Sequence, residues 1–297
     1  MAQLVECIPN FSNGQDKEII EAIVNEVRST AGVTLLDYSS DTSHNRSVVT
    51  FIGSPEGVEE AAVKMAVKSA QLIDLNKHKG EHPRMGAIDV IPFVPVKDIT
   101  EAECIEISKR TAQRVWDEAK IPVFLYESSA SAPHRQNLAA IRKGQFEGMA
   151  EKVKSPEWTP DYGTGINPTA GVVAVGARPP LVAYNINLNT SDLTIASNIA
   201  KIIRQSSGGL SYVKALGVML EDRKIAQVSI NMTNYEKTPL YRVFELVKAE
   251  ARRYGVSVLG CEIIGLTPMN ALIGTAEYYL QLEGFDSKKQ VLENHIL

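Results

Sequence analysis

Hydrophobic positions in the first third of the chain follow two different spacings. Short runs rich in β-branched residues predict four strands, which cover residues 3–9, 32–38, 47–53 and 87–95. Apolar residues three or four positions apart predict two helices, one over residues 16–29 and one that begins at Ser54 and Pro55. Their apolar faces carry Ile19, Ile20, Ile23, Val24 and Val27 in the first helix, and Val58, Ala62, Met65 and Ile73 in the second. The predicted order is β-α-β-β-α-β.

The middle of the chain is less regular. Thr100 and Glu103 form a capping-box pattern that predicts a third helix, and residues 121–128 predict one more strand. Residues 130–180 are punctuated by proline and glycine and contain few periodic segments. We interpret this stretch as a link between two halves or as a functional loop.

The second half of the chain repeats the order of the first. Strands are predicted over residues 181–187, 213–220, 225–232 and 256–266, with helices over 193–206 and from Thr238 and Pro239 onward. The predicted fold class is therefore α/β (α+β), with two ferredoxin-like βαββαβ subdomains that have mixed sheets. We place the first subdomain at residues 1–180 and the second at 181–297, and we expect a ligand-binding cleft between them.

Composition and charge narrow the class of protein. The 297 residues are 44% hydrophobic and carry a net charge of -4, which argues against nonspecific binding to nucleic acid. No apolar run is long enough to predict a membrane span. Cys7, Cys104 and Cys261 are far apart, odd in number and each in an apolar setting, so we predict no disulfide framework and a cytoplasmic location.

Two of the five histidines lie in the stretch KHKGEHPRMGAIDV, residues 77–90. The i, i+4 spacing of His78 and His82 would suit zinc on a helix, but Gly80 and Pro83 argue against a helix there. No cysteine is nearby, and the pattern of a helical zinc protease is absent. We therefore expect no metal site.

His82 differs from His78 because its neighbours restrain it. Pro83 stiffens the backbone after it, and the predicted core strand at residues 87–95 holds the loop in place. A histidine on a rigid element is suited to general acid–base catalysis near neutral pH. The alternative for this segment is a solvated basic loop.

Two other segments are candidates for ligand contacts. Arg46 begins a predicted strand after the polar segment at residues 39–45, and arginine can hold a carboxylate with two parallel hydrogen bonds. The segment GTGINPTAG, residues 163–171, lacks the lysine of a phosphate-binding loop and has Pro168 where a dinucleotide site needs glycine. Its glycines would let a ligand approach the backbone, and the alternative is a flexible linker.

Several long motifs resemble one family. QLVECIPNFSNG, LLDYSSDTSHNRSVVTFIG, KHKGEHPRMGAIDVIPFVPV and LVAYNINLNT are similar to the formiminotransferase domain of the formimidoyltransferase-cyclodeaminase family. KIAQVSINMTNYEKTPL and IIGLTPMNALI match the same family further along, so the resemblance covers nearly the whole chain. It implies transfer of a formimidoyl group between tetrahydrofolate and glutamate, by a homodimer of chains with two ferredoxin-like subdomains.

The resemblance also implies roles for particular residues. The catalytic histidine of the family motif falls on His82. The family's folate-binding segment, which departs here from the animal version, falls on Gly163, Thr164, Gly165, Ile166, Asn167, Pro168, Thr169, Ala170, Gly171 and Val172. Tetrahydrofolate is a cosubstrate, and neither a metal nor a redox cofactor is expected.

Both substrates are anionic, so an acidic protein needs local cations at its site. Our candidates for holding a substrate carboxylate are Asn45, Arg46, Lys79 and Arg84, and Lys77, Arg135 and Arg142 are further sources of positive charge. Small molecules are the expected partners, with no nucleic acid and no membrane. Because the animal proteins continue into a cyclodeaminase domain, we expect that activity to be absent or on a separate polypeptide. The alternatives are a glutamate formyltransferase that uses 5-formyltetrahydrofolate and a folate-binding protein without turnover.

Overall fold

The computed structural model describes residues 3–295. The chain forms two compact units, the first ending at Arg178 and the second beginning at Pro179. The first unit begins with β1 (Leu4–Cys7), β2 (Asn10–Phe11), α1 (Lys17–Arg28), β3 (Val33–Asp41), β4 (Arg46–Gly53), α2 (Pro55–Leu72) and β5 (Ile88–Lys97). It continues with α3 (Glu101–Ala119), β6 (Val123–Leu125), η1 (Glu127–Ser129), η2 (Pro133–Arg135), α4 (Leu138–Arg142), α5 (Gln145–Lys152), η3 (Pro156–Trp158) and β7 (Val173–Ala177).

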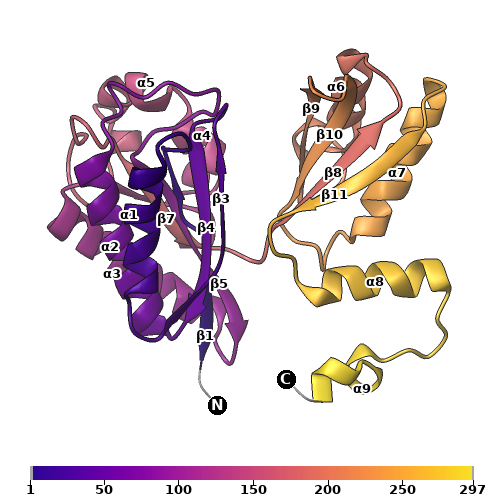
Figure 1. Cartoon of the computed structure of the whole chain (residues 1–297), viewed down its shortest axis with the longest axis horizontal. Helices are drawn as coiled ribbons and strands as arrows, with labels where there is room; N and C mark the ends of the chain where they lie inside the picture. Colours follow the sequence, from indigo (N-terminus) through magenta and orange to yellow (C-terminus); the bar gives the residue numbers. More distant parts are fainter. Residues whose placement is uncertain (1–2, 296–297) are drawn as a thin grey trace. The chain divides into compact units, whose positions relative to one another are not determined.

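The first sheet has a ferredoxin-like centre with two strands added. β1 and β2 lie between β4 and β5 and are antiparallel to both, and β3 pairs with the outer edge of β4. This is the order expected of a βαββαβ unit. β7 and β6 continue the sheet beyond β5 as parallel strands, while α1, α2 and α3 lie side by side against one face (Figure 1).

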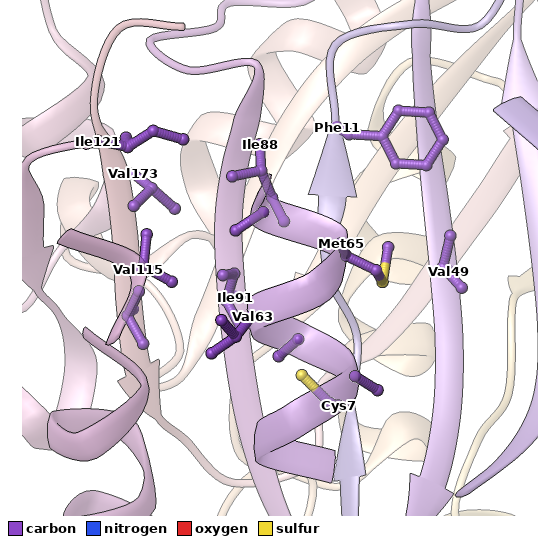
Figure 2. Packing of buried hydrophobic residues seen from close by; sticks show 14 of the residues in the cluster. Cys7, Phe11, Val49, Val63, Met65, Ile88, Ile91, Val115, Ile121 and Val173 are labelled. Atoms are coloured by element: carbon purple, nitrogen blue, oxygen red, sulfur yellow. The ribbon is translucent and has the colours of Figure 1, made fainter. Parts of the chain in front are cut away.

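The core of the first unit lies between these three helices and the sheet. Met65 of α2 and Val115 of α3 are fully buried in one cluster with the strand residues Phe11, Val49 and Ile91 (Figure 2). Local signals set the helix ends. The Ser54 hydroxyl accepts a hydrogen bond from the Gly57 N–H with Pro55 in the first turn, and the capping box predicted at Thr100 and Glu103 is confirmed.

The interpretation of residues 130–180 as a link between the two halves is wrong. The stretch contains α4, α5 and β7 and belongs to the first unit. β7 was missed because all five of its residues, VAVGA, are buried between β5 and β6, so no alternation marks it as a strand.

The second unit has the same βαββαβ order. Its elements are β8 (Val182–Leu188), α6 (Leu193–Ile203), η4 (Gln205–Ser207), β9 (Val213–Leu220), β10 (Ile225–Met232), α7 (Leu240–Arg253), β11 (Val258–Ile264), α8 (Met269–Leu280), α9 (Ser287–Gln290) and η5 (Leu292–His295). The strands are ordered β11-β8-β10-β9, with α6 and α7 packed on the sheet (Figure 1). The predicted ferredoxin-like topology is confirmed in both units.

Three details of the second unit differ from prediction. A mixed sheet was predicted, but all the strand pairs of this unit are antiparallel. In this fold, parallel pairs arise only from added strands such as β6 and β7. α8 was not predicted, since only Ala271 of its residues is buried and its other apolar side chains form no single stripe. Cys261 is exposed, unlike the buried Cys7 and Cys104, although its sulfur lies 3.1 Å from the Tyr184 hydroxyl.

No helix between residues 3 and 295 is long and apolar enough to cross a membrane.

The capping box of α3 should make a measurable contribution to stability. The Thr100 hydroxyl accepts from the Glu103 N–H at 3.2 Å, and the Glu103 carboxylate accepts from the Thr100 N–H at 2.8 Å. Both residues are exposed, so Thr100→Ala should remove the cap without leaving a cavity. We expect a loss of about 1 kcal/mol, seen as a melting temperature about 2–4 °C lower.

The matched control for this variant is Thr42→Ala. Thr42 is exposed, and its hydroxyl makes no hydrogen bond within the described chain. An equal loss of stability in both variants, measured by thermal unfolding, would contradict the assignment of the cap.

Candidate active site

The loop that carries His82 joins α2 to β5 and is closely packed against its neighbours. The Leu75 N–H donates to the Thr169 carbonyl at 2.9 Å, and the Glu81 N–H donates to the Ser43 carbonyl at 3.1 Å. A Cβ atom at Gly80 would lie 2.4 Å from the His44 carbonyl oxygen, so only glycine permits this approach. The loop is therefore positioned by the turn between β3 and β4.

Asn45 joins three loops at this place. Its Oδ1 accepts from the Gly14 N–H at 2.8 Å, and its Nδ2 donates to the Lys79 carbonyl at 2.9 Å. Its backbone has φ of 48°, in the left-handed region that asparagine tolerates better than most residues. Asn45 is buried, and each end of its amide already has a protein partner, which indicates a positioning role.

His78 and Arg84 close the loop around His82. The Arg84 Nε–H donates to His78 Nδ1 at 3.2 Å, and the His78 Nε2 lies 2.9 Å from the Asn45 carbonyl oxygen. Since Nδ1 accepts, the proton of a neutral His78 is on Nε2. The two outer nitrogens of Arg84 donate to both oxygens of Glu147 in α5, at 2.8 and 2.6 Å. Most of the Arg84 fork is therefore occupied by protein groups.

The imidazole rings of His82 and His78 differ in their hydrogen bonding. Neither ring nitrogen of His82 has a hydrogen-bond partner among residues 3–295, and the half-buried ring meets His44 edge to face at 6.1 Å. Burial lowers the pKa of His82 to about 3, and the positive charges of Arg46, Arg142 and His44 act in the same direction against the opposing effect of Asp89. At neutral pH the ring is uncharged and able to accept a proton.

Arg46 presents an unpaired guanidinium next to His82. Its side chain forms no hydrogen bond or ion pair in the described part of the chain, and its Nε is buried without a partner. Burial lowers the pKa of Arg46 to about 10, and the neighbouring Arg142 adds to this effect while Asp89 and Asp41 oppose it. His82, Arg46 and Asp89 line one small hollow, together with Phe11, Ser12, His44, Asn45, His78 and Arg84.

The remaining cations predicted from sequence are placed differently. Lys79 is exposed and has no ion-pair partner between residues 3 and 295, whereas Lys77 lies 3.5 Å from Asp74. Arg135 is buried against Asp161 at 3.0 Å and also donates to two backbone carbonyls, which indicates a structural role. Arg142 ends α4 and donates to Asp89, which lines the same hollow as Arg46.

Sequence reasoning missed Glu147 and Asp89. Nothing in the sequence around Glu147 indicates its pairing with a residue 63 positions away. Asp89 carries a usable signal, because it is the one charged residue in the apolar run AIDVIPFVP, and a buried charge needs partners. It accepts from the Met85 N–H at 2.7 Å and from Arg142 at 2.5 Å.

The glycine-rich segment at residues 163–172 lies beside the end of the His82 loop, just before β5. The Val172 N–H donates to the Met85 carbonyl at 3.0 Å, and the Ala87 N–H donates to the Ala170 carbonyl at 2.9 Å. These bonds place the segment inside the first unit, so its interpretation as a flexible linker is wrong.

Only the first part of this segment is available to a ligand. Thr164, Gly165, Pro168 and Thr169 are exposed, whereas the last three residues, Ala170 to Val172, are buried. Asn167 shapes the turn between these parts, since its Oδ1 accepts from the N–H groups of Thr169 and Ala170. Gly165 has φ of +65°, and nothing lies within 4 Å of the position that its Cβ would take.

A larger hollow of about 480 Å³ lies on the second unit, between the start of α7 and α8. Its walls include Tyr235, Tyr241 and Tyr278, and its charged residues are Glu236 and Glu277. These carboxylates would repel an anionic ligand, so the hollow is a poor match for folate or glutamate. In the part of the chain that the structure describes, no three His, Cys, Asp or Glu side chains are grouped closely enough to hold a metal ion.

The pair between Arg84 and Glu147 should stabilise the protein in a pH-dependent way. The Arg84 hydrogen bonds lower the pKa of Glu147 from its ordinary value of 4.5 to about 2. A lowered pKa gives a stabilisation that is complete above pH 4.5 and is lost as pH falls toward 2. Glu147→Gln should therefore lower the urea midpoint at pH 7, and the difference from the parent should narrow below pH 4.5.

Glu151→Gln in the same helix is the matched control. Glu151 pairs with Lys154 on the surface, with side chains 80% and 69% exposed, and such pairs contribute little. A difference for Glu147→Gln that stays constant from pH 7 down to pH 3 would rule out this linkage.

Comparison with known proteins identifies the family. The chain matches the model of the formiminotransferase domain, N-terminal subdomain, over residues 4–178 and that of the formiminotransferase domain over residues 183–295. It is 62% identical to a glutamate formimidoyltransferase of Streptococcus pyogenes serotype M1 over the whole of both chains. It is 47% identical to one of Thermoplasma acidophilum over 95% of this chain and 94% of the relative. The formimidoyltransferase-cyclodeaminase of Mus musculus is 44% identical over 95% of this chain, which spans 53% of that protein. The chain therefore belongs to the formiminotransferase family.

Proposed function

We propose that this protein is a glutamate formimidoyltransferase, which moves a formimidoyl group between N5 of tetrahydrofolate and the amino group of L-glutamate during histidine degradation. The observation that carries the proposal is the unpartnered His82 imidazole beside the unpartnered Arg46 guanidinium. Full-length similarity to relatives that bear this name supports the same activity.

The transfer is an exchange of one carbon between two nitrogens. The incoming amine attacks the formimidoyl carbon, which becomes tetrahedral with three nitrogens attached. The amine then loses a proton, the departing nitrogen gains one, and the bond between that nitrogen and the carbon breaks. His82 accepts the first proton and returns it to the departing nitrogen, so one imidazole serves both steps. The reaction has no redox step, and we propose that it runs without a metal ion.

Substrate binding changes the basicity of His82. Burial and the nearby guanidinium groups lower its pKa to about 3, so in the ligand-free protein it is a weak base. A substrate carboxylate beside Arg46 offsets this positive charge and raises the pKa of His82 again. The base is thus strengthened in the complex in which it is needed.

The four proposed carboxylate contacts fall into two groups. Arg46 and the exposed Lys79 have no ionic partner within the described residues, so we propose that they contact substrate carboxylates. Asn45 and Arg84 are held by protein groups, and we assign them to positioning the loop around His82. For folate we propose contacts with Thr164, Gly165, Pro168 and Thr169, the exposed part of the glycine-rich segment.

The proposal extends to partners and location. Tetrahydrofolate and glutamate derivatives are the small-molecule partners, and we propose a homodimer in the cytoplasm. The relatives named for both activities are longer, and this chain spans 53% and 54% of the two from Mus musculus and Dictyostelium discoideum. The free and mostly buried cysteines are compatible with a reducing compartment.

The direct test is an assay with N-formimidoyl-L-glutamate and tetrahydrofolate in a buffer that contains a metal chelator. We expect 5-formimidoyltetrahydrofolate and glutamate to form in equal amounts. Turnover of N-formylglutamate instead would indicate a formyltransferase. Folate binding without turnover of either compound would contradict an enzymatic function.

His82→Asn should remove the proton transfer and little else. A positioned acid–base group contributes on the order of 10²–10⁴ in rate, so kcat should fall by about that factor. Because His82 makes no hydrogen bond among residues 3–295, the melting temperature should change little. His295→Ala, which changes an exposed histidine of the second unit, is the control. Activity of His82→Asn within tenfold of the parent would exclude this role.

Gly165→Asn should weaken folate binding. Asparagine tolerates the φ of +65° and would project its side chain into the open space above the segment. The KM for tetrahydrofolate should rise more than that for N-formimidoyl-L-glutamate. Gly284→Asn is the control, since Gly284 has φ of +64° and equally open surroundings. Equal changes in both KM values, or none, would argue against a folate site here.

A further inference from the structure

Arg142 and Asp89 form a buried ion pair at the candidate site. Arg142 ends α4, and one of its outer nitrogens donates to Asp89 of β5 at 2.5 Å. Its Nε is buried without a partner in the described chain, as is the Nε of Arg46. Its side chain is 15% exposed, and the carboxylate that it holds, Asp89, lines the hollow that also contains His82 and Arg46.

We propose that Arg142 and Arg46 together bind the α-carboxylate of the glutamate substrate, with Asp89 as the residue that positions Arg142. This inference rests on the proposed function and assigns one end of the substrate to one pair of residues. Two guanidinium groups offer several planar donors, which suits the two oxygens of a carboxylate.

The charges around the pair favour a monoanion. Arg46 and Arg142 contribute two positive charges, and the buried carboxylate of Asp89 offsets one of them. Asp41 also acts on Arg46, but it is exposed and lies 2.9 Å from His44. One positive charge is left over in a buried setting, and a single carboxylate neutralises it.

The chemistry of glutamate indicates which carboxylate is bound. The amino nitrogen and the α-carboxyl carbon are attached to the same carbon atom. A carboxylate held beside His82 therefore brings its own amine to the imidazole, whichever way the side chain turns. The γ-carboxylate lies at the end of a flexible chain, and the exposed Lys79 is available for it.

Asp89 is suited to fix this geometry. It is 3% exposed, and its Oδ1 accepts from the Met85 N–H at 2.7 Å while its Oδ2 accepts from Arg142. The carboxylate is thus anchored to the backbone that leads directly from the His82 loop. Arg142 and His82 are positioned through the same short piece of chain.

The test compares three amino-acid acceptors with 5-formimidoyltetrahydrofolate as donor. These are L-glutamate, isoglutamine and glutamine. Isoglutamine is the α-amide of glutamate and lacks the negative charge of the α-carboxylate. Glutamine is the γ-amide and lacks the negative charge of the γ-carboxylate. Discrimination is measured as kcat/KM, or as inhibition constants where turnover is too slow. In Arg142→Gln the preference for glutamate over isoglutamine should fall by about tenfold or more. The preference for glutamate over glutamine should stay near that of the parent.

A pH profile separates this role from a purely structural one. The positive charges of Arg46 and Arg142 disfavour the protonated form of His82, so loss of one raises the pKa of His82. The acid limb of kcat/KM should move to higher pH in Arg142→Gln. Arg142→Lys keeps the charge, so its acid limb should stay close to that of the parent, with an intermediate loss of discrimination against isoglutamine.

The outcomes are distinguishable. If Arg142→Gln keeps the parent preference against isoglutamine, or loses both preferences equally, the assignment of the α-carboxylate is wrong. If Arg142→Gln does not fold, Arg142→Lys decides the question, because unchanged discrimination in that variant overturns the inference. If the parent protein transfers nothing to glutamate, it is the proposed function itself that fails.

Discussion

The hydrogen bonds of Asn45 are the interaction on which the candidate site depends. Its side chain joins the loop before α1 to the loop after α2, and its own carbonyl holds His78. Together with the hydrogen bond from the Glu81 N–H to the Ser43 carbonyl, these bonds keep the His82 loop against the turn between β3 and β4. Because Asn45 is buried, each bond is protected from competition with water, and its loss would leave unpaired polar groups.

Electrostatics then gives the positioned loop its chemistry. The chain as a whole is acidic, yet guanidinium groups converge on His82 from β4 and from the end of α4. The charge of Arg84 is matched by Glu147, and that of Arg142 is matched by Asp89. Arg46 has no protein partner among the described residues. This unequal pairing leaves positive charge at one place, beside an uncharged imidazole.

Much of the fold could be predicted from the sequence because its signals are local. The spacing of Ile20, Ile23, Val24 and Val27 gives α1, and the pair Thr100 and Glu103 gives the start of α3. β7 and α8 could not be predicted, since one is buried on every side and the other is mostly exposed.

The site was predictable to a smaller extent. A long family motif singles out His82, and its role stays a prediction. The difference in charge pairing between Arg46 and Arg84, by contrast, follows from tertiary contacts. Arg84 meets Glu147 from a helix far along the chain, whereas Arg46 meets no carboxylate within ion-pair distance in the described part. Residue type alone cannot separate two such arginines.

The late position of β7 in the chain has a consequence for synthesis and folding. β7 pairs with β5 across some eighty residues of intervening chain, and the backbone just before it also holds Leu75 and Ala87. Such pairing between distant segments closes large loops and slows folding. On the ribosome, the elements from β1 to β5 emerge long before the strand that completes them. The loop around His82 therefore lacks part of its support until the last part of the first unit has left the exit tunnel, so the nascent chain completes its candidate catalytic centre late.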